Sequence, residues 1–305
     1  MISLTNYKPK MVNYVFPGTL REKERIHESL IDILKYDKKG CDLRRLVTYS
    51  IEDLHVWNWV HEFFPYFTIC VQKFILNYIM VKLRMEDCIL CGSTRSDIDH
   101  SLSKCEMSMN RSRKNPARLG RYQWRHDAIL EQIAHGITQW FNFDVYADSL
   151  RDYKPMEELV FVANGKNRYP DLVVDLGSKY LILELSCCLE ANMEWERDYR
   201  RGRYTNVESP DGKKIDVFSL EISVIGIFDP SPLKAMLDVM WKHQGRKPIP
   251  RVFDLICLQA STAAALASYY IHKERHRQQN NVFEEPLYLS YRSIHYRYLE
   301  EINSS

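Results

Sequence analysis

The spacing of apolar residues predicts helices in the first part of the chain. In residues 20–34, and again in 71–79, apolar side chains recur every three or four positions, which is typical of an amphipathic helix. Residues 124–141 have the same period, with Ile129, Ile133 and Ile137 along one face and Asp127 and Glu131 along another. We therefore expect a helical region over residues 1–86 and a further helix that begins near residue 124.

Short apolar runs predict strands in the second half of the chain. They lie at residues 159–162, 172–174, 180–185, 218–228 and 252–258, and turn-forming or charged residues separate them. A charged helix is expected at 191–204 and another helix at 261–277. Helical and strand patterns that alternate in this way predict a mixed α/β fold.

Composition narrows the class of protein without naming a function. Of the 305 residues, 45% are hydrophobic and 27% are charged, which excludes collagen-like, mucin-like and wholly disordered chains. The net charge is only +2, so any binding of nucleic acid must come from local clusters of Lys and Arg. The N-terminus lacks the apolar core of a secretory signal, and polar residues interrupt the most apolar window, residues 63–81. We expect a nuclear or cytoplasmic protein that is not secreted and has no membrane partner.

Four potential metal ligands follow one another at the spacing C-x2-C-x8-H-x4-C. They are Cys88, Cys91, His100 and Cys105. Three thiolates and one imidazole complete a tetrahedral shell without an open position, which is typical of structural zinc. The sequence therefore predicts a zinc knuckle over residues 87–106. The alternative is that four reduced residues share this segment by coincidence.

A basic segment follows the cysteines, and we define residues 107–120 as a basic linker. Like charges in such a segment repel one another and also bind phosphate backbones, so a solvated loop and a nucleic-acid contact are both open interpretations. The candidate contacts in the linker and just beyond it are Arg111, Arg113, Lys114, Arg118, Arg121 and Arg125.

Two acidic residues fall opposite one another in a predicted hairpin, within RYPDLVVDLGSKYLILELS. If Gly177 and Ser178 form a two-residue loop, counting outward places Asp171 opposite Glu184. Opposite residues share a face with Cβ atoms about 5 Å apart, so the two carboxylates can share a divalent cation such as Mg²⁺ or Mn²⁺. The alternative is that Asp171 is a turn residue and Glu184 a surface acid near a helical arginine.

The order of these motifs resembles a known family. The cysteine and histidine cluster, RYQWRHD, RYPDLVV and LILELSCCLEANMEWERDYRRGRY are similar to the C-terminal region of non-LTR retrotransposon polyproteins. That region contains a CCHC zinc motif followed by a restriction-enzyme-like endonuclease of the PD-(D/E)xK class. The resemblance covers residues 55–275, and it implies an endonuclease domain over 121–280 and a C-terminal tail over 281–305.

The resemblance implies an enzyme that nicks target DNA, with RNA as an alternative partner. Asp171 and Glu184 would hold a catalytic Mg²⁺ or Mn²⁺, and zinc would be structural. The family's RHD-type motif on the preceding helix is matched by His126 and Asp127, and Glu131 lies one turn further on. Asp127 and Glu131 are further catalytic candidates, and His126 is a candidate contact with nucleic acid.

One position departs from the family pattern. The class has a lysine two residues after the second acid, where this chain has Ser186, and relatives place the lysine on the following helix. That helix carries Arg200, Arg201 and Arg203 here, and arginine contacts phosphate but cannot act as a base. The alternative function is a zinc-containing nucleic-acid-binding module that has lost cleavage, and a third is a structural interaction protein.

Overall fold

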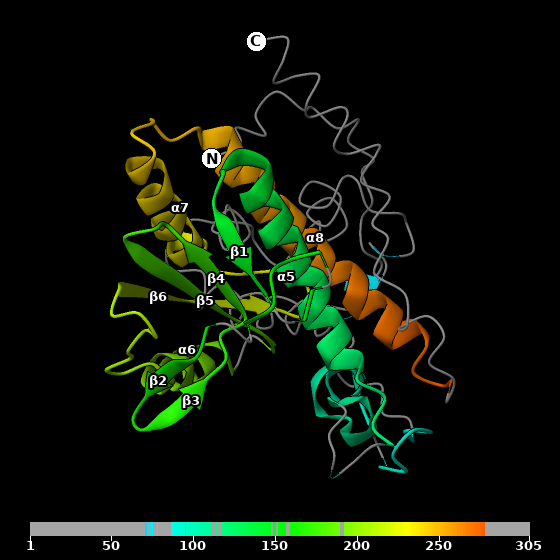
Figure 1. The fold of residues 1–305 in the computed structure, drawn as a ribbon. Coiled ribbons are helices and arrows are strands. Elements are labelled where there is room, and N and C mark those ends of the chain that lie inside the picture. Colours follow the sequence, from blue (N-terminus) through cyan, green and yellow to red (C-terminus); the bar gives the residue numbers. More distant parts are fainter. Residues whose placement is uncertain are drawn as a thin grey trace, which may run out of the picture.

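The computed structural model describes part of the chain. The described residues are 71, 74, 75, 78 and 87–277, without 95, 111–113, 115, 116, 148, 151, 157, 158, 190 and 191. The helix expected over residues 20–34, the tail over 281–305 and the candidate contacts Arg111 and Arg113 lie outside them. Within them the predicted mixed α/β class is confirmed, since helices pack on a mixed sheet (Figure 1).

The sheet has four strands in the order β1 (Asp144–Tyr146), β4 (Leu172–Asp175), β5 (Lys179–Cys188) and β6 (Lys214–Ser223). The first three pair antiparallel, and β6 runs parallel to β5 because α6 (Met193–Arg203) connects them. Strands β2 (Phe161–Ala163) and β3 (Lys166–Arg168) form a separate hairpin.

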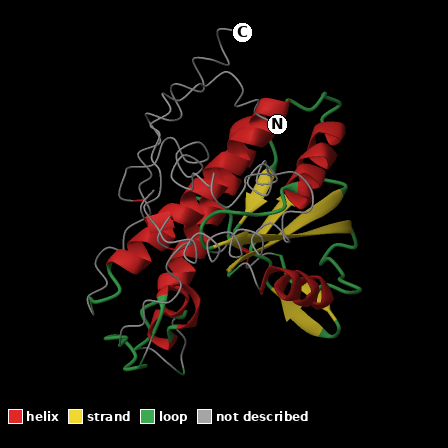
Figure 2. Ribbon diagram, turned by 180° about the vertical axis from the view of Figure 1, so that it is seen from behind, coloured by secondary structure: helices red, strands yellow, loops and turns green. Residues whose placement is uncertain are grey.

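Both faces of the sheet are covered. Side chains alternate between the two faces along each strand, so each strand contributes to a cluster on either side. One face packs against α5 (Arg121–Trp140), α7 (Ser231–His243) and α8 (Pro250–Lys273). It contributes Leu172, Val174, Leu181, Leu183 and Leu185 to the main core. The opposite face contributes Val173, Tyr180 and Ile182 to a second cluster with Phe161 and Tyr204. Figure 2 shows α6 and the β2–β3 hairpin together, away from the long helices.

Helices α5 and α8 lie against one another over much of their length (Figure 1). By length and composition α8 is apolar enough to cross a membrane, but 61% of its most apolar window is buried inside the fold. Burial of this kind is also expected of a helix at the centre of a protein core.

The strand predicted over residues 252–258 is wrong, because this segment is the start of α8. A short apolar run fits a buried strand and a buried helix equally well. The alanine-rich sequence that follows continues the helix without a break to Lys273.

The strand predicted over residues 218–228 is shifted in the structure. Strand β6 begins earlier, because parallel pairing with β5 starts at polar Lys214, and it ends at Ser223. There the Ser223 hydroxyl accepts the backbone N–H groups of Ile225 and Ile227. Gly226 completes the turn at φ 88°, where an added Cβ would lie 2.4 Å from the Ser261 carbonyl oxygen of α8.

Candidate active site

The predicted hairpin register is confirmed. Leu172 pairs with Leu183 and Asp175 with Tyr180, and Gly177 adopts a φ of 81° in the connecting turn. Asp171 precedes the Leu172 pair and so lies opposite Glu184. The backbone N–H of Leu185 donates to Asp171 Oδ2 at 2.8 Å, which fixes this carboxylate at the end of the ladder.

An open sheet edge lets α5 reach Asp171. Strand β1 is only three residues long and ends opposite Val173, so it does not cover the beginning of β4. His126, in the second turn of α5, lies with Nε2 3.4 Å from Asp171 Oδ2 and Nδ1 3.0 Å from Asp127 Oδ1. The structure thus joins His126 to the predicted acidic pair.

Glu184 is almost fully buried, with 1% of its side chain exposed, yet both oxygens have partners. The Tyr204 hydroxyl donates to Oε1 at 2.6 Å, and Arg200 and Arg203 donate to Oε2 at 2.9 and 3.3 Å. Burial raises the pKa of Glu184, and the nearby Asp171 carboxylate raises it further. Three donors therefore offset the cost of burying this acid.

Asp171 and His126 form a charged pair. Although burial opposes ionisation of the carboxyl, His126 and the Leu185 N–H hold the pKa of Asp171 below its usual value. Burial also disfavours the charged imidazole, but Asp171 and Asp127 outweigh it and raise the pKa of His126 to about 10. At neutral pH the site therefore contains an imidazolium beside an ionised carboxylate.

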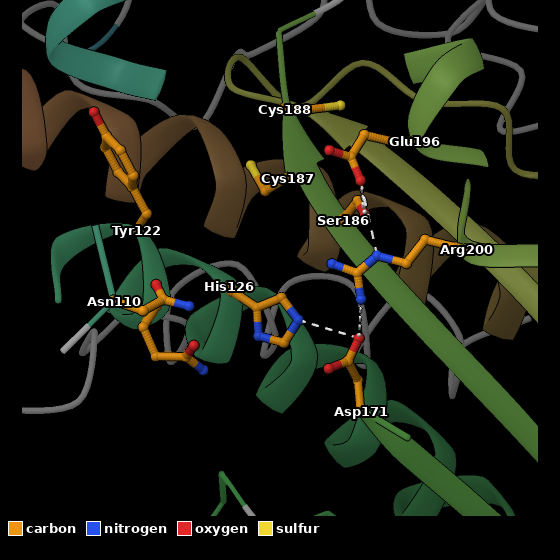
Figure 3. Close-up of a pocket in the computed structure, with 10 residues that line it drawn as sticks. Asn110, Tyr122, His126, Asp171, Ser186, Cys187, Cys188, Glu196 and Arg200 are labelled. Atoms are coloured by element: carbon orange, nitrogen blue, oxygen red, sulfur yellow. Dashed lines mark hydrogen bonds and ion pairs between the residues drawn. The ribbon is translucent and has the colours of Figure 1, made fainter. Parts of the chain in front are cut away.

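Arg200 of α6 lies between the two predicted metal ligands. Its Nη1 is 2.9 Å from Glu184 Oε2 and 3.6 Å from Asp171 Oδ2. Figure 3 shows Arg200 approaching Asp171 from α6, while His126 approaches from α5. The hairpin register places the two carboxylates close together, and they share one cationic group, the Arg200 guanidinium.

A polar pocket of about 330 Å³ opens beside these residues. Asp171, His126 and Arg200 line it, together with Asn110, Tyr122, Gln123, Ser186, Cys187, Cys188 and Glu196 (Figure 3). Glu184 is not among its lining residues, because it lies beneath Arg200. The pocket therefore combines anionic and cationic side chains with hydroxyl and amide groups.

Several residues of the site were not among the predicted ones, and three of them, Ser186, Glu196 and Tyr204, contact the acids or their partners. Ser186, at the position of the expected lysine, donates its hydroxyl to Glu196 Oε2 at 3.3 Å. Glu196 was detectable, because it lies four residues before Arg200 on the same helix and their side chains come within 3.8 Å. No local pattern marks Tyr204, which follows the end of α6 and reaches Glu184 only through the fold.

Two candidate nucleic-acid contacts are wrong, because Arg121 and Arg125 are buried, at 0% and 1% exposure. Arg121 donates to the carbonyl oxygens of Glu274 and Arg277 at 3.0 and 2.6 Å. Arg125 donates to the Ser268 hydroxyl at 3.1 Å. Both arginines face α8 and the segment after it, so they join helices and are not available to phosphate.

The remaining predicted residues do not line the pocket. Asp127 sits behind His126 and accepts a hydrogen bond from Gln123 at 2.6 Å. Glu131 does not line the pocket, and burial, with Asp152 and Asp127, raises its pKa. Lys114 and Arg201 are exposed. Arg118 pairs with Glu106 at 3.4 Å.

The predicted zinc ligands converge. The ligand atoms of Cys88, Cys91, His100 and Cys105 all lie within 4.8 Å of one another. The sulfurs of Cys88 and Cys105 are 3.8 Å apart, and Cys91 Sγ lies 3.3 Å from His100 Nε2. Tetrahedral zinc with Zn–S bonds of about 2.3 Å separates its sulfurs by about 3.8 Å. This cluster could hold a metal ion, and its donor set is compatible with zinc.

The cysteine cluster is attached to the α/β domain through Tyr122 of α5. The Tyr122 hydroxyl accepts the N–H of Cys105 at 3.0 Å and lies 3.1 and 3.2 Å from the carbonyl oxygens of His100 and Ser101. Because Tyr122 and Asn110 also line the pocket, the cluster and the pocket share a wall.

Comparison with protein-family models and with curated proteins gives no match for the chain.

Proposed function

We propose that this chain is a metal-dependent DNA endonuclease domain of retrotransposon origin, a truncated or domesticated remnant, in which zinc holds the CCHC knuckle. The observation that carries the proposal is the position of Asp171 opposite Glu184, one residue beyond the last pair of the β4–β5 ladder, where Arg200 contacts both acids. Arg200 supports it, because this residue of the following helix reaches both acids. The restriction-endonuclease-like assignment of the fold is part of the same proposal.

The donor set at the hairpin fits Mg²⁺ or Mn²⁺, since hard divalent cations prefer carboxylate oxygens. Asp171 and Glu184 would hold the ion, and when bound it would activate water and stabilise charge on the scissile phosphate. His126 and Arg200 are cationic groups on the pocket, so they would bind and orient the phosphodiester. Asn110 and Gln123 add polar side chains to the lining of the pocket.

The test is nicking of supercoiled plasmid DNA by the zinc-loaded chain in Mg²⁺ or Mn²⁺. We expect Asp171→Ala to lower the nicking rate about 100-fold or more, since losing even an outer-shell partner of a metal costs 10–100-fold. Asp216→Ala is the matched control, because Asp216 is a sheet carboxylate that pairs with Lys179 outside the pocket. Equal nicking by wild type and Asp171→Ala would refute the proposed site.

A specific observation favours a second candidate, a nucleic-acid-binding module without cleavage. Arg200 and His126 already neutralise the two acids, and Ser186 replaces the lysine of the class. In this case the wild-type protein would bind DNA in a salt-dependent manner but leave plasmid intact with either metal.

A further inference from the structure

Arg200 occupies the centre of a group of three carboxylates that come from three different elements. Nη1 contacts Glu184 of β5 at 2.9 Å and Asp171, the residue directly before β4, at 3.6 Å. On the other side of the guanidinium, Nε lies 3.8 Å from Glu196 of α6. These acids would repel one another without a cation between them. The fold therefore creates a place for one positive group and fills it with an arginine.

The same guanidinium closes Glu184 off from the pocket. Arg200 lines the pocket with 22% of its side chain exposed, whereas Glu184 is 1% exposed and does not line it. Arg203 and Tyr204 contact Glu184 independently of Arg200, so the carboxylate would keep two of its donors if Arg200 moved. Arg200 is thus the side chain that separates the deeper acid from the pocket.

The contacts of Arg200 leave part of its guanidinium unsatisfied. Its Nε is buried and makes no hydrogen bond among the described residues, since Glu196 lies beyond hydrogen-bond distance. Arg197, one turn earlier on α6, differs, because its Nε donates to the buried Glu221 at 2.9 Å. Moving Arg200 would therefore break its contacts with Glu184 and Asp171 but no bond at Nε, whereas moving Arg197 would break the Nε bond to Glu221.

We propose that Arg200 and the divalent cation compete for Asp171 and Glu184, so that Arg200 is a removable plug over the metal site. This inference rests on the proposed function. When a nucleic-acid phosphate enters the pocket, the guanidinium exchanges its carboxylate partners for the phosphate oxygens, which suit its planar donors. Withdrawal of Arg200 frees the two carboxylates for the metal ion. Phosphate binding and metal binding consequently strengthen one another.

The experiment measures Mn²⁺ binding to the zinc-loaded full chain, in the absence of DNA, from the electron paramagnetic resonance signal of free Mn²⁺. We expect Arg200→Ala to bind one Mn²⁺ with a Kd at least about tenfold lower than that of the wild type, because a competing charge has been removed. The additional change Glu184→Gln should abolish this gain, because it removes a metal ligand.

Arg197→Ala is the matched control. Arg197 lies on the same helix, has similar exposure and also pairs with a buried sheet glutamate, but it does not line the pocket. We expect its Mn²⁺ affinity to equal that of the wild type. If Arg200→Ala does not fold by circular dichroism, Arg200→Met retains the apolar stem and takes its place.

Unchanged or weaker Mn²⁺ binding by the folded Arg200 variant would overturn the plug, since a purely structural arginine cannot oppose the metal. Tighter binding by Arg197→Ala to the same degree would also overturn it, because the effect would then be general to α6. The nicking assay is separate. If Arg200→Ala binds Mn²⁺ more tightly than the wild type and the wild type does not nick DNA, the plug is supported and the nuclease is refuted. If the wild type nicks DNA and Arg200→Ala binds Mn²⁺ no more tightly, the nuclease is supported and the plug is refuted.

Discussion

The Tyr122 hydroxyl is the point at which the cysteine cluster can be loosened without touching a metal ligand. Tyr122→Phe removes a group that accepts from Cys105 N–H at 3.0 Å and donates to a carbonyl, that of His100 or of Ser101, at 3.1 or 3.2 Å. The phenyl ring remains, so the packing of α5 should be retained.

The structure sets the size of the expected effect. A net protein hydrogen bond contributes about 1 kcal/mol, so losing both contacts costs about 2 kcal/mol at most. The Cys105 N–H keeps a second acceptor, the His100 carbonyl at 2.7 Å, so no buried donor is orphaned. We therefore expect a loss of about 1–2 kcal/mol, which corresponds to a factor of about 5–30 in an equilibrium constant.

The assay is zinc transfer from the purified chain to a coloured chelator, because ligand ordering and metal binding are linked. Tyr122→Phe should release zinc at a chelator concentration about 5–30-fold lower than the wild type does. Tyr199→Phe is the control, since Tyr199 is 53% exposed on α6. Wild-type zinc retention by Tyr122→Phe would show that the knuckle holds its metal independently of α5 and refute this reasoning.

Two further predictions concern the packing of α5 and the basic residues. Gly136→Ala should lower the free energy of unfolding by about 1–3 kcal/mol, measured in urea, because the new Cβ would lie 2.5 Å from Ile256 Cγ1 on α8. Ile256→Ala in the same chain should restore part of this loss, and a simple gain in stability from better helix propensity would contradict the packing. Arg121→Met should cost about 2–5 kcal/mol and leave the salt dependence of DNA binding unchanged, since the buried Arg121 side chain loses its hydrogen bonds to the Glu274 and Arg277 carbonyls. Arg201→Met, at an exposed position, should leave stability unchanged and reduce that salt dependence, and the opposite pattern would place Arg121 at the nucleic acid.

Local rules in the sequence were sufficient for the hairpin. A two-residue loop fixes the register, and the strand period of two then decides which side chains share a face. Asp171 and Glu184 therefore come together as the sequence predicts. The cysteine cluster was equally local, because its four ligands lie within 18 consecutive residues and the structure brings them together.

The tertiary structure decided what balances the charge of these acids. His126 reaches Asp171 because β1 is too short to cover the edge of β4, and Arg200 reaches Glu184 because α6 folds back over β5. Charge alone predicts that two close acids need a cation. Which cation fills the place depends on helices whose positions are not encoded in the hairpin.

The same distinction explains the errors. The sequence shows that Arg121 and Arg125 are basic but not that α8 lies against them, so their charges suggested a surface that the fold instead buries. The apolar run at residues 252–258 carried too little local information to separate strand from helix, and its packing against α5 made it part of α8. Contacts within a hairpin or a short loop follow from the covalent order of the chain. Contacts between elements more than 100 residues apart, such as Arg121 with the Glu274 carbonyl, exist only once the whole core has formed.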